Sequence, residues 1–125
     1  MKSMIVLAGA LLTATVLAMA PARAEGDAAA GKKVFNKCMA CHDAVNDKSK
    51  VGPSLHNVVG RKAGTFEGFK YSDAMKKADV TWSNETLDKY LTDPKGFVPG
   101  NRMSFAGVKK EADRKAVIDY LDTVK

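Results

Sequence analysis

Apolar side chains recur at three- and four-residue spacing in three parts of the chain, and this spacing predicts three amphipathic helices. The helices run over residues 27–37, 83–93 and 110–124. Asp27 is a candidate N-cap of the first helix and Ser83 of the second. Their side-chain oxygens can accept hydrogen bonds from the free backbone N–H groups of the first turn.

Two long stretches between these helices, residues 43–60 and 94–109, contain repeated turn signals built from Gly, Pro and Asn. A short helix, opened by Ser72 and ending near Ala78, lies between them, and Pro94 ends the helix before the second stretch. No segment alternates well enough to predict a strand. The predicted fold class is all-α, with about four to five helices and long loops that line a binding site.

The N-terminal residues 1–24 have the pattern of a cleavable secretory signal peptide. Lys2 precedes an apolar run from Met4 to Met19, and a small-x-small cleavage site ends at Ala24. A helix over that run would span roughly 24 Å, less than the ~30 Å hydrocarbon core of a bilayer. A cleaved signal is therefore favoured over a retained anchor. Either would export the domain, which in a bacterium places it in the periplasm.

The remaining residues 25–125 are enough for one small domain, whose own hydrophobic core would be marginal. The full chain carries a net charge of +6, and loss of Lys2 and Arg23 with the leader lowers it by two, to +4. This modest excess suits an acidic partner surface. There is no nucleic-acid-binding motif.

Cys38 and Cys41 are followed directly by His42, which is the attachment pattern of a covalently bound haem c. On one helical turn both thiols point to the same side, where each can add to a vinyl group of the porphyrin. His42 then lies beneath the ring and can bind the iron. The haem also supplies apolar surface for a small core.

Three other interpretations use the same residues. A thioredoxin-like dithiol would require a βαβ pattern, which the sequence lacks. A structural zinc site usually has four Cys or His ligands, and the adjacent Cys41 and His42 are poorly placed to share one tetrahedral ion. A disulfide between Cys38 and Cys41 is the third alternative.

A second iron ligand is expected among the methionines and the other histidine. Met39 lies in the attachment turn and cannot reach the opposite face of the ring. Met103 lies in a loop 61 residues after His42, where the chain is free to fold across that face. Position favours Met103, with Met75 and His56 as alternatives.

The order of these motifs resembles class I cytochrome c over nearly the whole of residues 25–125, most closely mitochondrial cytochrome c and its short soluble bacterial relatives. The matching segments are Gly31–Phe35, Cys38–His42, Gly52–His56, Gly60–Lys62, Gly68–Ala74, Trp82, Glu85–Leu87, Tyr90–Leu91, Pro94–Lys95, Pro99–Gly100, Met103–Phe105 and Tyr120–Leu121.

The resemblance implies a role for each position. His42 and Met103 would bind the iron, and the Pro53 carbonyl would accept the bond from the other nitrogen of His42. Tyr90 would hydrogen-bond near the Met103 sulfur. The other contacts to the haem would come from Arg61, Tyr71 and Trp82 at the propionates and from Phe105 near the exposed ring edge. Without the resemblance, the aromatic residues would be ordinary core residues and Arg61 a solvated one.

Gly31 costs the first helix about 1 kcal/mol relative to Ala, so close approach of another helix is expected there. The resemblance places Gly31 and Phe35 across Tyr120 and Leu121.

Two positions depart from the mitochondrial pattern. Met75 stands where an Asn usually joins an internal hydrogen-bond network, and Asn101 stands where a Thr usually reaches a propionate. Asn101 can still donate a hydrogen bond, whereas Met75 cannot replace an amide.

The resemblance implies a monomeric single-electron carrier, not an enzyme, between a cytochrome bc-type complex and a terminal oxidase or photosynthetic reaction centre, without stable membrane insertion. Six cations in segments that flank the haem crevice would bind acidic patches on these partners. These docking cations are Lys37, Lys50, Lys95, Arg102, Lys109 and Lys110. The alternatives are a haem enzyme or gas-binding cytochrome with an open sixth site, and a thiol-disulfide oxidoreductase.

Overall fold

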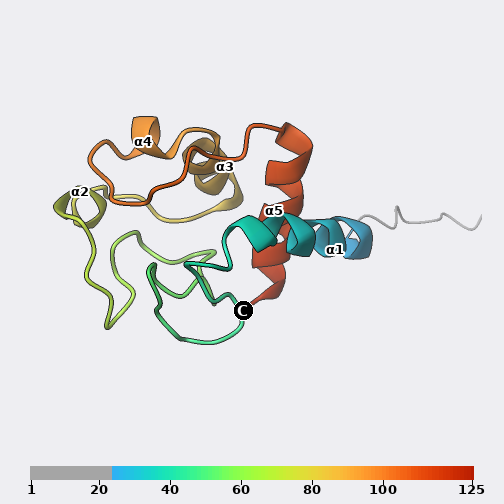
Figure 1. The fold of residues 1–125 in the computed structure, drawn as a ribbon, viewed down its shortest axis with the longest axis horizontal. Coiled ribbons are helices and arrows are strands. Elements are labelled where there is room, and N and C mark those ends of the chain that lie inside the picture. The colour runs from blue at the N-terminus through green and yellow to red at the C-terminus, as the bar shows by residue number, and fades with distance from the viewer. Residues whose placement is uncertain (1–23) are drawn as a thin grey trace, which may run out of the picture.

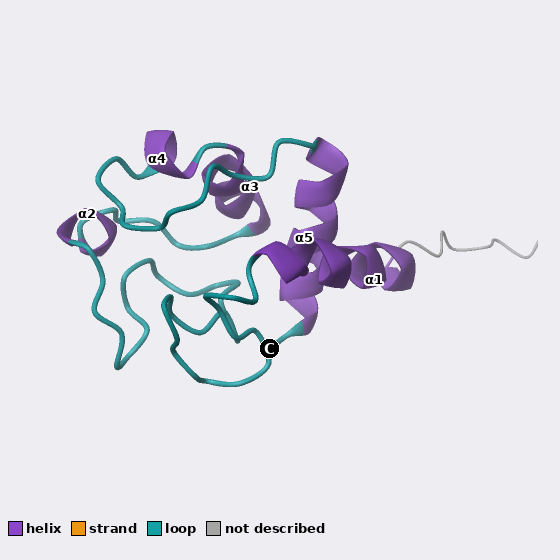
Figure 2. Ribbon diagram, viewed as in Figure 1, coloured by secondary structure: helices purple, strands orange, loops and turns teal. Residues whose placement is uncertain are grey.

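The computed structural model describes residues 24–125, which form five α-helices and one 3-10 turn around long loops (Figures 1 and 2). The elements are α1 (Ala24–Val34), the 3-10 turn η1 (Phe35–Lys37), α2 (Asp73–Lys76), α3 (Asn84–Thr92), α4 (Pro94–Phe97) and α5 (Glu111–Thr123). Within residues 24–125, β pairing is limited to two isolated bridges. The all-α prediction is confirmed. The predicted signal peptide lies outside the described residues, apart from Ala24.

The crossing of α1 and α5 organises one end of the molecule, as Figure 1 shows. Gly31 is buried at the crossing, where a Cβ atom would lie 1.8 Å from the carbonyl oxygen of Ala116. The ring of Phe35 packs on that of Tyr120, with centroids 5.3 Å apart. The close helix approach expected at Gly31 is confirmed.

Ser83 caps helix α3 as predicted, and its side chain accepts from the backbone N–H of Thr86. The Thr86 hydroxyl in turn accepts from the Ser83 backbone N–H, which completes a capping box. Arg114 of α5 donates through Nε to Asp88 Oδ1 of α3 at 2.8 Å. This partly buried bond fixes α3 beside the α1–α5 pair.

Two of the predicted boundaries are wrong. The first helix starts at Ala24, so Asp27 lies inside α1 and is not its N-cap. Pro94 does not begin a loop but occupies the first turn of α4, and the Asp93 side chain caps this helix through Gly96 N. Proline is favoured in a first turn because its missing N–H needs no partner there.

Ser72 caps α2 as predicted, by accepting from Met75 N, and α5 matches the predicted 110–124 helix to within one residue at each end. The core joins the helices to the loops. Its buried members include Phe35, Ala44, Val58, Ala63, Trp82, Leu87, Tyr90, Val98, Val117, Ile118 and Leu121. Among residues 24–125, none of the helices has the length and apolarity needed to cross a membrane.

Candidate functional site

The attachment motif forms one tight turn directly after α1 and η1. The carbonyl of Cys38 accepts from the backbone N–H groups of Cys41 at 3.0 Å and of His42 at 2.9 Å. Cys38 and Cys41 are both free thiols and both partly exposed. Burial raises the pKa of Cys38, and the positive charge of Lys37 opposes this shift. The turn thus presents two free thiols beside an imidazole.

The imidazole of His42 has a fixed tautomer. Its Nδ1 lies 2.7 Å from the carbonyl oxygen of Pro53, and a carbonyl only accepts, so Nδ1 carries the proton. Nε2 is left with its lone pair. Burial lowers the pKa of His42, more than the bond to Pro53 raises it, and Arg61 lowers it further. A neutral imidazole held through its other nitrogen is the usual form of a metal-ligating histidine.

Gly52 leaves the space that the His42 ring occupies, a role that the sequence did not predict. A Cβ atom at Gly52 would lie 2.4 Å from Cε1 and 2.9 Å from Nε2 of His42. The Gly52 N–H donates to the Cys41 carbonyl at 2.8 Å, which holds the loop against the turn. In the sequence, Gly52 precedes Pro53 and signals only a turn. Nothing local indicates that its missing side chain makes room for His42.

Met103 lies in the loop between α4 and α5, and its sulfur has a hydrogen-bond donor. The Tyr90 hydroxyl of α3 donates to Met103 Sδ at 3.8 Å. Tyr90 is buried against Trp82, with ring centroids 4.9 Å apart. Burial raises the pKa of Tyr90 to about 12, so its proton stays available for this bond at neutral pH.

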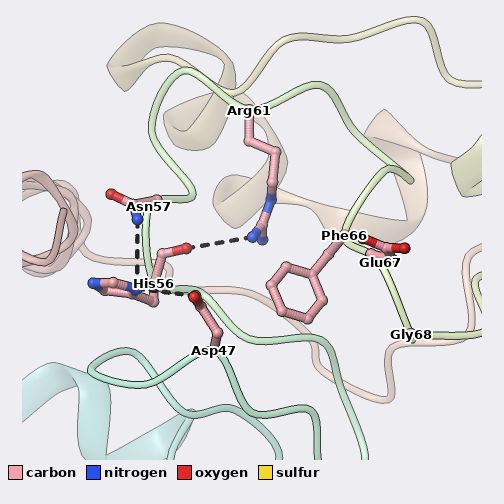
Figure 3. Close-up of a pocket in the computed structure, with 7 residues that line it drawn as sticks. All are labelled: Asp47, His56, Asn57, Arg61, Phe66, Glu67 and Gly68. Carbon is pink, nitrogen blue, oxygen red and sulfur yellow. Dashed lines mark hydrogen bonds and ion pairs between the residues drawn. The ribbon is translucent and has the colours of Figure 1, made fainter.

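Arg61 is a fixed residue rather than a solvated one. Its Nη2 donates to the carbonyl of Ser54 at 2.7 Å, and its guanidinium lies 5.0 Å from the centroid of the Phe66 ring. Ser54 is fully buried. Figure 3 shows Arg61 above a pocket of about 470 Å³ that Phe66 also lines. Arg61 Nη1 also donates to the carbonyl of His56 at 3.4 Å. The Arg61 side chain is therefore preorganised, and its remaining guanidinium N–H groups are still available for a carboxylate.

His56 lines the same pocket and contacts a carboxylate there. Its Nδ1 lies 3.0 Å from Asp47 Oδ1, and both residues line the pocket with Asn57 and Glu67 (Figure 3). The sequence indicates His56 only as an alternative iron ligand. It does not predict this carboxylate partner, which lies nine positions earlier.

Tyr71, Trp82 and Phe105 lie in three separate loop segments. The Tyr71 hydroxyl accepts from the Phe66 N–H at 3.2 Å, so its own proton is free for another acceptor. Trp82 is buried in the core, and the Phe105 N–H donates to the Met103 carbonyl at 3.0 Å. The contacts predicted between these side chains and the haem stay predictions.

Asn101 has other partners than a propionate. Its Nδ2 donates to the carbonyls of Pro94 at 2.8 Å and Val98 at 2.9 Å, and its Oδ1 accepts from Met103 N at 2.9 Å. Both amide protons are thus occupied. The predicted propionate contact stays a prediction that would require one of these bonds to break.

These residues fit a covalent haem c, because two free thiols on one turn adjoin an imidazole that keeps one nitrogen available. An all-α protein with this attachment turn is in the class of c-type cytochromes. The family model described as Cytochrome c matches residues 28–125.

The curated relatives agree. The chain is 56% identical over 99 residues to "Cytochrome c2 iso-2" of Magnetospirillum molischianum, covering 79% of this chain and 99% of that protein. It is 48% identical over 115 residues to "Cytochrome c2" of Rhodomicrobium vannielii, covering 91% and 92%. Among solved structures, "cytochrome cH from Methylobacterium extorquens" superposes with a TM-score of 0.74 at 46% identity, over 78% of this chain and 99% of that one.

The chain belongs to the cytochrome c family. It carries one haem c with its iron, attached through Cys38 and Cys41, and its activity is electron transfer rather than catalysis. The family prediction, the all-α cytochrome fold and the cofactor are confirmed.

Proposed function

We propose that the protein is a periplasmic single-electron carrier in which His42 and Met103 bind the iron from opposite faces. The hydrogen bond from Tyr90 to the Met103 sulfur is the observation that carries the proposal. It gives the partly buried sulfur of Met103 a fixed donor. Met75 of α2 packs against the same core, but within residues 24–125 its sulfur receives no such hydrogen bond. His56 is engaged by Asp47.

Each side chain has a defined part in this activity. When bound, haem supplies a centre that gains and loses one electron. His42 is oriented by its bond to Pro53, which makes Nε2 a better donor. Met103 would supply the second iron ligand, so no coordination position would be left for a substrate. His/Met ligation and burial both favour the reduced state.

An optical spectrum tests the ligand set. The reduced wild-type protein should show a sharp c-type spectrum that carbon monoxide does not change at neutral pH. Met103→Ala should open the sixth position, so that the same gas shifts its spectrum promptly. Met75→Leu, which keeps an apolar side chain in α2, is the control and should behave as wild type. A prompt shift in the wild-type protein would contradict the proposal and favour an open-site enzyme or gas-binding protein.

The docking cations support a partner with acidic patches. Within residues 24–125, the ion pairs involve other cations, namely Lys62, Lys76, Lys89, Arg114, Lys115, Lys125 and His56. The docking cations instead donate to backbone carbonyls or are exposed: Lys50 donates to Met39 O at 3.1 Å and Lys109 to Thr92 O at 3.1 Å. These bonds fix the positions of the charges and neutralise none of them.

We propose that these cations dock the carrier on a cytochrome bc-type complex as donor and on an oxidase or a photosynthetic reaction centre as acceptor. Electron-transfer rates with such a partner should then fall as ionic strength rises. Lys37→Gln should lower the second-order rate constant several-fold at low salt. Lys115→Gln removes an equal charge outside the set and should change it little. Rates that are flat with salt, or equal losses in both variants, would contradict this docking surface.

The periplasmic location depends on the predicted signal peptide. Mass spectrometry of the exported protein should give a chain that begins at Glu25. A chain that retains residues 1–24 in the membrane fraction would instead show an uncleaved anchor.

A further inference from the structure

Asn101 is a buried polar residue two positions before Met103, the proposed ligand. Only 4% of its surface is exposed. A buried amide is costly unless its donors and acceptor are satisfied. Here each has a partner, since Nδ2 donates twice and Oδ1 accepts from Met103 N at 2.9 Å.

The partners of Nδ2 belong to one rigid piece of chain. They are the carbonyls of Pro94, in the first turn of α4, and of Val98, the residue that ends α4. Pro94 and Val98 are themselves buried. The Asn101 N–H also donates to the Val98 carbonyl, at 3.1 Å. Asn101 is thereby bound to α4 through both its backbone and its side chain.

The Oδ1 atom of Asn101 links α4 to the backbone of Met103. The distance from Met103 N to Oδ1 is 2.9 Å, so the backbone of Met103 is held while Tyr90 holds its sulfur. Gly100 has φ +88, which lets the chain reverse just before Asn101. Lys95 Nζ donates to the Asn101 backbone carbonyl and adds a further tie to α4.

We propose that Asn101 is a positioning residue that holds Met103 at the iron by fixing the ligand loop, residues 99–103, to α4. This inference rests on the proposed His42/Met103 ligation. A side chain whose two amide protons are both bonded to carbonyls of Pro94 and Val98 ties the loop to α4 and has no proton left for a haem propionate. A threonine here could donate only one hydrogen bond, so the asparagine gives this chain a more fully tied loop.

The test uses the covalently loaded protein and follows how often Met103 leaves the iron. Two readouts serve: amide hydrogen exchange at Met103, and the rate at which imidazole replaces Met103 on the ferric protein. Asn101→Ala should raise both by about tenfold or more, a factor that corresponds to about 1.4 kcal/mol. Asn101→Ser retains one hydroxyl and should give an intermediate rise. This variant keeps the test informative if the alanine variant does not fold.

Thr86→Ala is the matched control. It removes the Thr86 hydroxyl, which accepts from the Ser83 N–H in the α3 capping box. The global stability should therefore fall, while the ligand loop is not altered. It should leave imidazole binding unchanged. Wild-type rates in both Asn101 variants, or a rise no larger than that of Thr86→Ala, would overturn the positioning role.

Failure of the proposed ligation has a separate signature. If Met103 does not bind the iron, the wild-type protein itself lacks the charge-transfer band of methionine-ligated ferric haem, and carbon monoxide shifts its reduced spectrum. A closed sixth site in the wild-type protein, together with wild-type exchange and imidazole-binding rates in the Asn101 variants, would contradict the positioning role and leave the proposed ligation intact.

Discussion

Tyr90 and Met103 are joined by a hydrogen bond between the α3 hydroxyl and the Sδ atom of the loop before α5, at 3.8 Å. In the proposed ligation by Met103, this bond would draw electron density from the sulfur and weaken its donation to ferric iron. It therefore stabilises the reduced state of a methionine-ligated haem.

Tyr90→Phe removes this bond and keeps the ring that packs on Trp82. A hydrogen bond of about 0.5–1.5 kcal/mol corresponds to roughly 20–65 mV for one electron. We therefore expect the reduction potential to fall by that amount in protein-film voltammetry. Tyr120→Phe alters a hydroxyl at the α1–α5 crossing and should leave the potential unchanged. An unchanged potential in Tyr90→Phe would mean that the bond does not act on the iron.

The fold was largely predictable because its helices have local signals. Ser72 and Ser83 have the side chains that cap α2 and α3, and the apolar period marks α5. The errors have local causes too. α4 is a four-residue helix, too short to show a period, and Pro94 can either end a helix or begin one.

The site was only partly predictable, because its supporting contacts are not local. The attachment motif occupies five consecutive residues and carries its own chemistry. The space that Gly52 leaves for His42, however, appears only when a loop folds back across ten positions. Likewise, the bonds of Asn101 to Pro94 and Val98 depend on α4, which the sequence did not reveal.

Gly52→Ala tests the space that Gly52 leaves for the proximal imidazole. A methyl group there would overlap the His42 ring, at 2.4 Å from Cε1, so the ring or the loop must move. We expect a lower yield of haem-loaded protein and an altered ferric spectrum. Val51→Ala, at an exposed neighbouring position, should give wild-type yield and spectrum. A wild-type spectrum for Gly52→Ala would show that the imidazole tolerates displacement.

Gly31→Ala has two opposing effects on stability, a gain in helix propensity and a loss in packing. Alanine would favour α1 by about 1 kcal/mol, but its Cβ would lie 1.8 Å from the Ala116 carbonyl oxygen. Overpacking of this kind costs about 1–3 kcal/mol or more. We therefore expect net destabilisation, measured by denaturant unfolding of the ferric protein. Ala30→Gly, at the exposed neighbouring position, reports the propensity effect alone. A more stable Gly31→Ala protein would refute the close crossing.

Asp119 of α5 should make the stability of the fold depend on pH in the opposite direction from a typical carboxylate. Burial raises its pKa, and the negative charges of Asp27 and Asp122 raise it further. A carboxyl whose pKa is higher in the folded state than in the unfolded chain makes folding weaker as the pH rises through the unfolded value, near pH 4. The loss persists at neutral pH, where the group is ionised in both states.

Asp119→Asn should therefore be more stable than wild type at pH 7 and equal to it near pH 3. Glu111→Gln in the same helix gives the matched comparison. Glu111 lies in the first turn of α5, where a negative charge favours the helix, and it pairs with Lys115 at 3.2 Å. Its removal should lower stability at pH 7, so the two neutralised carboxylates act in opposite directions. Denaturant titrations at pH 3 and pH 7 measure the stability of both variants. A loss of stability in Asp119→Asn at pH 7 would contradict the unfavourable clustering of Asp27, Asp119 and Asp122.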